Sequence, residues 1–379
     1  LLLFCLNVFA GLPPIWVISL AVYAAFYFFQ QNSLNTVFSA LLRMDAELDR
    51  FRAILRYLET APYAGHPALA ELCEPFRDPR NSPSAQIRRI KITTAGVGLR
   101  SNPVMGLLLN VVLPWDFFFA FLADHYRAQV VQTLPLWVQV CYELDALLAL
   151  ANFAYLNPGY TFPELAANAR PVLQTEELGH PLIPESHRVC NDFSVDGLGE
   201  VAIITGSNMA GKSTFIKTVG TNLCLGYAGA PVCARHWRSA PFRLHTCIRI
   251  TDSIVDGFSY FYAEVKCLKA LLKELESNNA LPLLYLIDEI FRGTNNRERL
   301  LGSRAYLQAL VGKNGIGLLA THDLELAGLA DRYAQLHNYH FEDEVADDRL
   351  VFDYKIHPGP SPTTNALKIM QMEGLPVES

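Results

Sequence analysis

One segment of this chain constrains its fold more than any other: an apolar run, a loop with glycine at both ends, and a helical pattern. Val201–Ile204 has the composition of a buried strand, residues 206–214 read Gly-Ser-Asn-Met-Ala-Gly-Lys-Ser-Thr, and the helical pattern begins at Phe215. This is the spacing G-x-x-x-x-G-K-[ST] in the strand–loop–helix context that the motif requires. Glycines in such a loop let backbone N–H groups surround phosphate oxygens, and the helix N-terminus adds a favourable dipole. The segment therefore predicts a nucleotide-binding α/β domain.

The loop also predicts individual roles. We expect Lys212 to reach the β- and γ-phosphates and Ser213 to ligate Mg²⁺. The alternative is a glycine-rich turn with an idle lysine, which the flanking strand and helix disfavour. The residues predicted to contact the nucleotide phosphates are Gly206, Ser207, Asn208, Met209, Ala210, Gly211, Lys212, Ser213 and Thr214.

Two further apolar runs end in polar side chains. Leu283–Ile287 is followed by Asp288 and Glu289, and Gly317–Ala320 is followed by a Thr-His-Asp triplet centred on His322. Beside the loop strand, Asp288 would hold Mg²⁺ and Glu289 would orient the attacking water. A simple strand cap is the alternative for the acidic pair. His322 either senses the γ-phosphate or is incidental to a helix N-cap.

Composition limits the other possibilities. The chain has 379 residues, of which 51% are hydrophobic and 18% charged, so two domains or more are expected. A net charge of −6 excludes nucleic-acid binding by bulk positive charge, although a local basic patch remains open. The eight cysteines include no CxxC pair, which argues against a disulfide framework and a zinc site and favours reduced cytosolic thiols. Cys233 and His236 form a lone CxxH, for which ordinary packing is favoured.

The N-terminus is uncharged up to Arg43. Residues 1–29 are apolar apart from Gly11 and the pair Pro13–Pro14, so they resemble a tight helical hairpin, truncated at its start. Its second limb, residues 12–29, would extend roughly 27 Å, close to the hydrocarbon thickness of a bilayer. We expect a transmembrane hairpin, with a buried core hairpin as the alternative. The ATP-consuming part would then face the cytoplasm.

The middle of the chain has helical patterns. Apolar residues follow a heptad spacing from Val37 to Leu58, which indicates either a coiled coil or an ordinary amphipathic helix packing on its own domain. Val104–Ala123 carries Pro114 and Asp116 and is expected to be a buried core helix rather than a membrane span. Composition becomes loop-like near residue 170. The predicted domains are residues 1–29, 30–170 and 171–379.

Four stretches together resemble the ATPase domain of the MutS family of DNA mismatch-repair proteins. They are GSNMAGKST, DEIFRGTN from Asp288, LLATHDLEL from Leu318, and GFSYFYAE from Gly257. The similarity is strong over residues 176–379 and weaker over 117–170. It implies an α/β P-loop ATPase domain of the ABC class, with a mixed sheet flanked by helices and preceded by an all-α core or lever region. It also implies hydrolysis of ATP with Mg²⁺ in a homodimer with composite sites.

The resemblance assigns roles residue by residue. Lys212, Glu289 and His322 match the catalytic positions, and Ser213 with Asp288 matches the Mg²⁺ ligands. Ser259 matches a serine donated in trans to the partner's site, and Thr294 belongs to a loop that contacts that site. Near the adenine, the family has an aromatic side chain where this chain has Arg188, which could stack on the base, and Asn191 lies close by.

This chain departs from the family in its N-terminal part. Residues 1–29 are apolar where the family has a mismatch-reading domain, and residues 30–170 leave little room for a DNA clamp. The pattern resembles membrane-associated MutS-related proteins. DNA binding stays possible through Arg88, Arg89, Lys91 and Arg100, for which a solvated helix face is the plainer interpretation. Two alternatives remain: a transport-type ABC ATPase, which the missing Leu-Ser-Gly-Gly-Gln signature disfavours, and a nucleotide-switched membrane scaffold without DNA binding.

Overall fold

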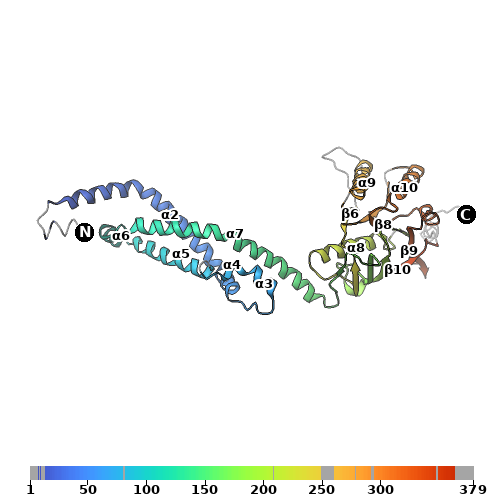
Figure 1. The fold of residues 1–379 in the computed structure, drawn as a ribbon, viewed down its shortest axis with the longest axis horizontal. Helices are drawn as coiled ribbons and strands as arrows, with labels where there is room; N and C mark the ends of the chain where they lie inside the picture. Colours follow the sequence, from blue (N-terminus) through green and yellow to red (C-terminus); the bar gives the residue numbers. More distant parts are fainter. Residues whose placement is uncertain are drawn as a thin grey trace. The chain divides into compact units, whose positions relative to one another are not determined.

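The computed structural model describes residues 7, 9, 13–79, 82–207, 209–248, 260–277, 279–291, 294–346 and 349–362 (Figure 1). The chain divides into two compact units, Leu1–Leu148 and Ala149–Ser379. This division falls inside a long helix, α7 (Trp115–Leu156), and lies before the domain boundary that we predicted near residue 170.

The first unit is helical, as the sequence predicts. Its elements are α2 (Ile15–Thr60), α3 (Pro67–Leu72), α4 (Glu74–Arg77), α5 (Pro83–Gly98), the 3₁₀ turn η1 (Leu99–Ser101), α6 (Pro103–Val112) and the first part of α7. The starts of α5 and α6 follow local chemistry: Ser82 caps the N–H of Ala85, Asn102 caps the N–H of Met105, and each cap is followed by proline.

The heptad pattern in α2 corresponds to an internal seam. Leu41, Leu48 and Leu55 are each 5% exposed or less, and they belong to a core shared with α4, α5 and α7. The helices α2 and α5 and the first part of α7 run side by side (Figure 1). The ordinary amphipathic helix is therefore the interpretation that the structure bears out.

The expectation of one buried helix over Val104–Ala123 is wrong. The chain breaks at Leu113–Pro114 into α6 and α7, because proline disfavours helical backbone in the residue before it. Most apolar side chains of α6 are exposed, including Val104 and Leu107 at 68% each. The buried charge is compensated: Asp116 is 1% exposed and contacts the guanidinium of Arg100.

The first limb of the predicted hairpin lies mostly outside the described residues, which include only Asn7 and Phe9 of it. Its second limb does begin a helix directly after Pro14, and α2 then continues without interruption to Thr60. By length and composition, α7 is the helix of the described part that could cross a membrane, and little of its apolar stretch is buried. Core helices of soluble proteins meet the same two criteria.

The second unit is a mixed α/β structure with two sheets. A four-stranded sheet has the order β1-β5-β2-β3, and a six-stranded sheet has the order β10-β9-β4-β8-β7-β6. The strands are β1 (Glu164–Leu165), β2 (Leu173–Leu178), β3 (Asn191–Val195), β4 (Val201–Thr205), β5 (His236–Ser239), β6 (Arg243–Cys247), β7 (Leu283–Asp288), β8 (Gly315–Ala320), β9 (Leu336–Ala346) and β10 (Arg349–Pro358). The helical elements are η2 (Glu185–His187), α8 (Lys212–Tyr227), α9 (Tyr260–Glu276), α10 (Asn296–Leu310) and α11 (Leu324–Ala327).

The larger sheet is covered on both faces. Strands β4, β6, β7, β8 and β9 pair in parallel, and β10 pairs antiparallel with β9. Ile204 and Leu286 face one core together with Phe215 of α8, whereas Ile203 and Ile287 face the other, where α9 and α10 pack. Burial on both faces explains why β4, β7 and β8 are continuous apolar runs. The polar residues that end these strands consequently meet at one sheet edge.

Candidate nucleotide site

The loop between β4 and α8 needs its glycines for two reasons. Gly206 has φ of 139° and a Cβ there would lie 2.7 Å from the carbonyl oxygen of Phe341, while Gly211 has φ of 117°. L-residues rarely adopt such backbone, and no other side chain fits beside Phe341. Met209 is also left-handed and is 82% exposed, whereas Ala210 is buried. Asn208, which we predicted to contact phosphate, lies outside the described residues.

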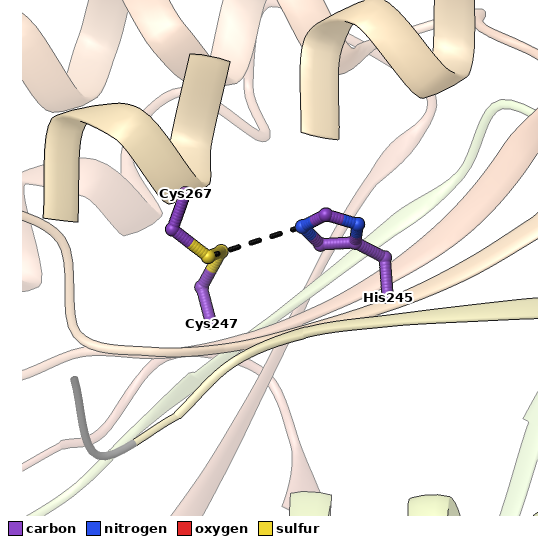
Figure 2. Close-up of side chains that lie close together, drawn as sticks. All are labelled: His245, Cys247 and Cys267. Atoms are coloured by element: carbon purple, nitrogen blue, oxygen red, sulfur yellow. Dashed lines mark hydrogen bonds between the residues drawn. A yellow bond between two sulfur atoms is a disulfide. The ribbon is translucent and has the colours of Figure 1, made fainter. Parts of the chain in front are cut away.

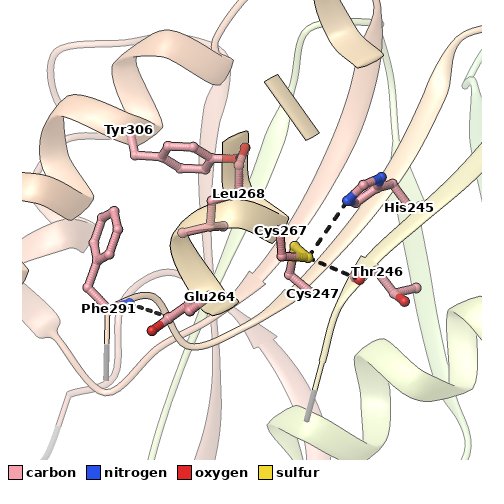
Figure 3. The surroundings of a disulfide bond; sticks show 8 residues. All are labelled: His245, Thr246, Cys247, Glu264, Cys267, Leu268, Phe291 and Tyr306. Atoms are coloured by element: carbon pink, nitrogen blue, oxygen red, sulfur yellow. Dashed lines mark hydrogen bonds between the residues drawn. A yellow bond between two sulfur atoms is a disulfide. The ribbon is translucent and has the colours of Figure 1, made fainter. Parts of the chain in front are cut away.

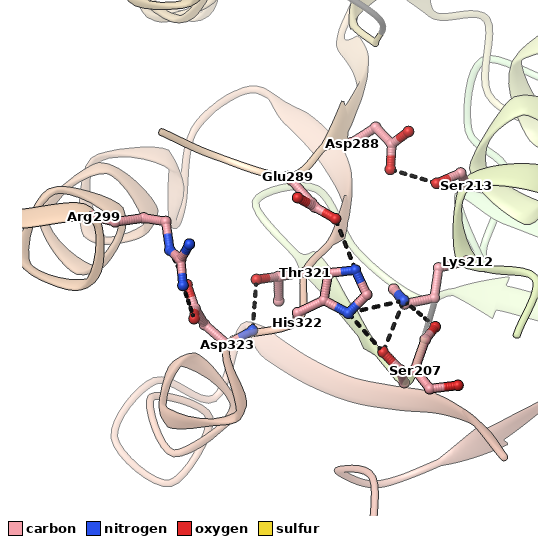
Figure 4. Close-up of polar contacts among 10 residues, drawn as sticks. Ser207, Lys212, Ser213, Asp288, Glu289, Arg299, Thr321, His322 and Asp323 are labelled. Atoms are coloured by element: carbon pink, nitrogen blue, oxygen red, sulfur yellow. Dashed lines mark hydrogen bonds and ion pairs between the residues drawn. The ribbon is translucent and has the colours of Figure 1, made fainter. Parts of the chain in front are cut away.

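Lys212 is held inside this loop. Its side chain is nearly buried at 5% exposure, and Nζ donates to the carbonyl oxygens of Gly206 at 2.8 Å and Ser207 at 2.6 Å (Figure 4). It is also the first residue of α8, where the helix dipole favours an anion. The ammonium of Lys212 and the start of a helix therefore both favour an anion at this loop.

Ser213 and Asp288 meet across the sheet. The Ser213 hydroxyl donates to Oδ1 of Asp288 at 2.7 Å (Figure 4). We expected the Asp288 strand beside the loop strand, but β8 lies between β4 and β7. The two side chains still reach each other because Ser213 extends from α8 rather than from the sheet. A hydroxyl and a carboxylate are hard oxygen donors of the kind that Mg²⁺ prefers, so the pair fits that ion.

Glu289 and His322 form a second pair at the same edge. Nε2 of His322 lies 2.8 Å from Oε1 of Glu289, and Nδ1 lies 3.0 Å from the carbonyl oxygen of Gly206 and 3.3 Å from Nζ of Lys212 (Figure 4). Glu289 has a left-handed backbone with φ of 63°, and its N–H donates to Ala320. Such backbone in a non-glycine residue clusters at functional sites. The imidazole thus joins the acidic residue to the loop.

Arg299 and Glu264 support this edge, and sequence reasoning gave neither a role. Arg299 makes two hydrogen bonds, of 3.0 and 2.9 Å, to the carboxylate of Asp323, directly after His322. The alternative for this triplet was a helix N-cap. Asp323 is the N-cap residue of α11, but its side chain makes no capping hydrogen bond. Glu264 is 2% exposed and accepts from the N–H of Phe291, two residues beyond Glu289. Glu264 is the last residue of the GFSYFYAE stretch, and the resemblance of that stretch was the sequence feature that could have pointed to it.

The remaining predicted residues are bonded elsewhere. Arg188 donates to the carbonyl oxygen of Ile183 at 3.0 and 2.8 Å, and its guanidinium lies 5.5 Å from the centre of the Tyr160 ring. Asn191 bridges β3 to β10 through Tyr354 and Ile356. Stacking on adenine stays a prediction for Arg188.

Two predicted threonines lie near helix starts. Thr294 donates to Glu298 at 2.8 Å just before α10, and Thr214 is exposed on α8. Ser259 lies outside the described residues, as do Arg292 and Gly293.

His180 is a neighbour of Arg188, and its protonation state affects the charge there. Burial, followed by the charges of Lys217 and Arg188, lowers the pKa of His180. That histidine therefore adds no charge beside Arg188 near neutral pH.

Two of the cysteines are paired. Cys247 at the end of β6 and Cys267 on α9 form a disulfide, so the expectation of reduced thiols throughout is wrong for this pair. The sequence offered no CxxC because the two cysteines are 20 residues apart and meet only through tertiary packing. Cys233 is buried, and its N–H donates to Asn222, in keeping with ordinary packing.

Comparison with known proteins finds relatives for the part of the chain that carries this site. The sequence model described as MutS domain V matches residues 202–379, from β4 to the end of the chain. The chain is 31% identical over 261 residues to the DNA mismatch repair protein MutS of Thermus thermophilus, covering 68% of this chain and 31% of the relative. It is 31% identical over 241 residues to MutS of an Exiguobacterium species, covering 62% of this chain and 27% of the relative. It is 30% identical over 257 residues to DNA mismatch repair protein MutS 2 of Halobacterium salinarum, covering 66% of this chain and 29% of the relative. The chain thus spans less than a third of the length of these relatives.

Proposed function

Since this chain belongs to the MutS family through its C-terminal part, we propose that it binds ATP with Mg²⁺ and hydrolyses the γ-phosphate. The observation that most supports this proposal is that five polar side chains lie together at the carboxyl edge of one sheet. They are Lys212, Ser213, Asp288, Glu289 and His322. Positioning and charge supply most of the catalysis in phosphoryl transfer, so a fixed cluster of this kind is what the reaction needs.

The chain's own residues would divide the work. Lys212 would exchange its bonds to the loop carbonyls for bonds to β- and γ-phosphate oxygens. Ser213 and Asp288 would hold Mg²⁺, which neutralises charge on the phosphates. Glu289 would orient the attacking water, and His322 would contact the γ-phosphate.

The test separates binding from turnover. The full chain should bind ATP and release phosphate, and Glu289→Gln should bind ATP with little change while losing most of its hydrolysis. The carboxamide keeps the size of the side chain but no longer polarises water. Glu200→Gln is a matched control, since Glu200 also pairs with a histidine, His337, at 3.3 Å. Equal turnover in Glu289→Gln and wild type would disprove the assigned role.

Completion of the site by a second copy is part of the proposal. The resemblance gives Ser259 and Thr294 to the partner's nucleotide, which makes the active form a homodimer of the ABC class. Thr294 supports this in one respect: it stands partly exposed just before α10, on the segment that follows β7 and Glu289.

A membrane location is favoured by exposed apolar side chains of the first unit. On α2, Ile18 is 66% and Phe29 83% exposed, and α6 adds Leu107 at 68%. Tyr23 donates to Asn110, which places these two apolar stretches side by side. Large contiguous apolar surface marks an interaction site. We propose that it contacts lipid, with the nucleotide site on the cytoplasmic side. Flotation with lipid vesicles should be lost in a Val104→Ser, Leu107→Ser, Leu108→Ser variant.

DNA binding is proposed at one surface only. The predicted basic cluster is divided: Arg89 donates to Gln129 and Arg100 pairs with Asp116, so these two are used internally. Arg88 and Lys91 line a groove of about 510 Å³ between α2 and α5, and Lys91 also pairs with Asp49 at 2.7 Å. Arg52 and Arg56 line it as well, so four cations border one groove, where Asp49 pairs with both Lys91 and Arg52 and balances part of their charge. Phosphate groups are the ligand that such a groove suits. Lack of DNA binding would leave the nucleotide-switched scaffold as the better description.

A further inference from the structure

Three side chains with soft ligand atoms meet beside the larger sheet. His245 and Cys247 occupy alternate positions of β6, so both point to the same face of that strand. Cys267 extends toward them from α9, which packs on β6 (Figure 2). The imidazole nitrogen and the two sulfurs all lie within 4.8 Å of one another. This combination of residues is one that proteins use for soft divalent metals.

The surroundings favour a bound ion over a surface coincidence. Cys247 is 3% exposed and belongs to the core with Leu268 and Leu271, whereas His245 and Cys267 are half-buried. Sγ of Cys267 lies 3.8 Å from Nε2 of His245 and 3.6 Å from the carbonyl oxygen of Thr246 (Figure 3). One side of the cluster is therefore apolar and fixed, and the other admits an ion.

We propose that Cys247, Cys267 and His245 bind Zn²⁺ when the two thiols are reduced, and that the disulfide is the metal-free oxidised form of this site. In tetrahedral Zn²⁺ sites, bonds of about 2.3 Å to sulfur and 2.0–2.1 Å to nitrogen put ligand atoms roughly 3.5–3.8 Å apart. The His245–Cys267 pair already has that separation. The two sulfurs would move apart by about 1.7 Å from the usual disulfide length, which small side-chain rotations supply.

The two steps balance. A small dithiol transfers two electrons to the disulfide and becomes a disulfide itself, and Cys247 and Cys267 each gain a proton. Zn²⁺ then displaces both thiol protons and accepts the lone pair of His245 Nε2, releasing two protons per ion bound. With three protein ligands among the described residues, a water molecule takes the fourth position.

This site is chemically separate from the proposed Mg²⁺ position. Ser213 and Asp288 offer hard oxygen atoms, whereas the Cys247 cluster offers two sulfurs and a nitrogen, so the two sites select different ions. In either state the cluster joins β6 to α9, across a sequence separation of 20 residues. The cluster therefore holds α9 against β6, and α9 also contains Glu264.

Cobalt titration of the full chain tests the proposal without nucleotide. Protein reduced with a phosphine, which does not bind the probe as a thiol would, should take up one Co²⁺ per chain with a thiolate charge-transfer band. Excess Zn²⁺ should remove that band. His245→Ala should weaken Co²⁺ binding at least tenfold, Cys267→Ser should abolish the band, and oxidised protein should bind none.

Controls distinguish a site from nonspecific thiol binding. Cys224→Ser removes an exposed cysteine on α8 and should leave the titration unchanged. Because Cys247 is buried, the variants are made at His245 and Cys267, and circular dichroism checks that each is folded. Zn²⁺ should also protect two thiols per chain from alkylation in wild type. A reduced wild type that binds Co²⁺ no better than Cys267→Ser overturns the proposal, as does an unchanged affinity in folded His245→Ala.

Discussion

Nε2 of His322 lies 2.8 Å from Oε1 of Glu289, although 33 positions separate them in the sequence. The contact exists because β7 and β8 are neighbouring parallel strands whose carboxyl ends lie level, with Asp288 opposite Ala320. His322 also reaches the carbonyl oxygen of Gly206 in the loop. A single imidazole therefore connects the residue proposed to orient water with the residues proposed to bind phosphate.

Replacing His322 should slow turnover more than it weakens binding. His322→Ala removes the side chain that we propose contacts the γ-phosphate, together with its contact to Glu289, so kcat for ATP hydrolysis should fall by about 100-fold. Phosphate-release assays measure kcat, and equilibrium binding of a fluorescent ATP analogue measures affinity. His337→Ala is the control, since it removes an imidazole from another glutamate pair. A kcat within twofold of wild type in His322→Ala would exclude the role.

Mixed dimers should show whether the site is composite. Lys212→Ala loses phosphate contacts in its own subunit, and Ser259→Ala is expected to harm only the partner's site. Each variant alone should be inactive or nearly so, while an equimolar mixture should regain part of the wild-type ATPase rate through one intact composite site. Lys217→Ala, on the same helix as Lys212, is the control for nonspecific loss. A mixture no more active than its components contradicts completion in trans.

The first unit should depend on the contact between Arg100 and Asp116. Their side chains are 3.2 Å apart, and Asp116 also accepts from Tyr27 at 2.8 Å. Arg100→Ala leaves a carboxylate buried without its counter-charge, so unfolding free energy should fall by about 3–5 kcal/mol. Tyr27→Phe removes one hydrogen bond and should cost about 1 kcal/mol. Denaturant unfolding in detergent measures both, and equal effects of the two variants would contradict this ranking.

Duplex DNA, if bound, should contact the groove between α2 and α5. Arg56→Ala and Arg88→Ala should each weaken binding similarly for all sequences and reduce the slope of log K against log salt by about one. Arg127→Ala is the control, because Arg127 is exposed but paired with Asp124. Fluorescence anisotropy over a range of salt concentrations gives the slopes. An unchanged slope in both groove variants would place DNA contacts elsewhere.

Much of the proposed nucleotide site could be predicted from the amino-acid sequence. The spacing from Gly206 to Ser213 predicts a tight strand–loop–helix turn, because only certain residues allow the backbone of Gly206 and Gly211. The strand ends at Asp288 and His322 were predicted from apolar runs followed by polar residues. Local chemistry determined these features. The same holds for the helix starts at Pro83 and Pro103, where a capping side chain and proline act within one turn.

Tertiary structure alone decided which distant residues meet. β8 lies between the loop strand and the Asp288 strand, an order that no local pattern encodes. The pairing of Arg299 with Asp323, the contact of Arg100 with the buried Asp116, and the meeting of Cys267 with His245 and Cys247 all join separate elements. Such contacts depend on how whole helices and strands pack, and packing is a property of the assembled core rather than of neighbouring residues. The amino-acid sequence determined the chemistry available at each position, and the fold decided which of these groups act together.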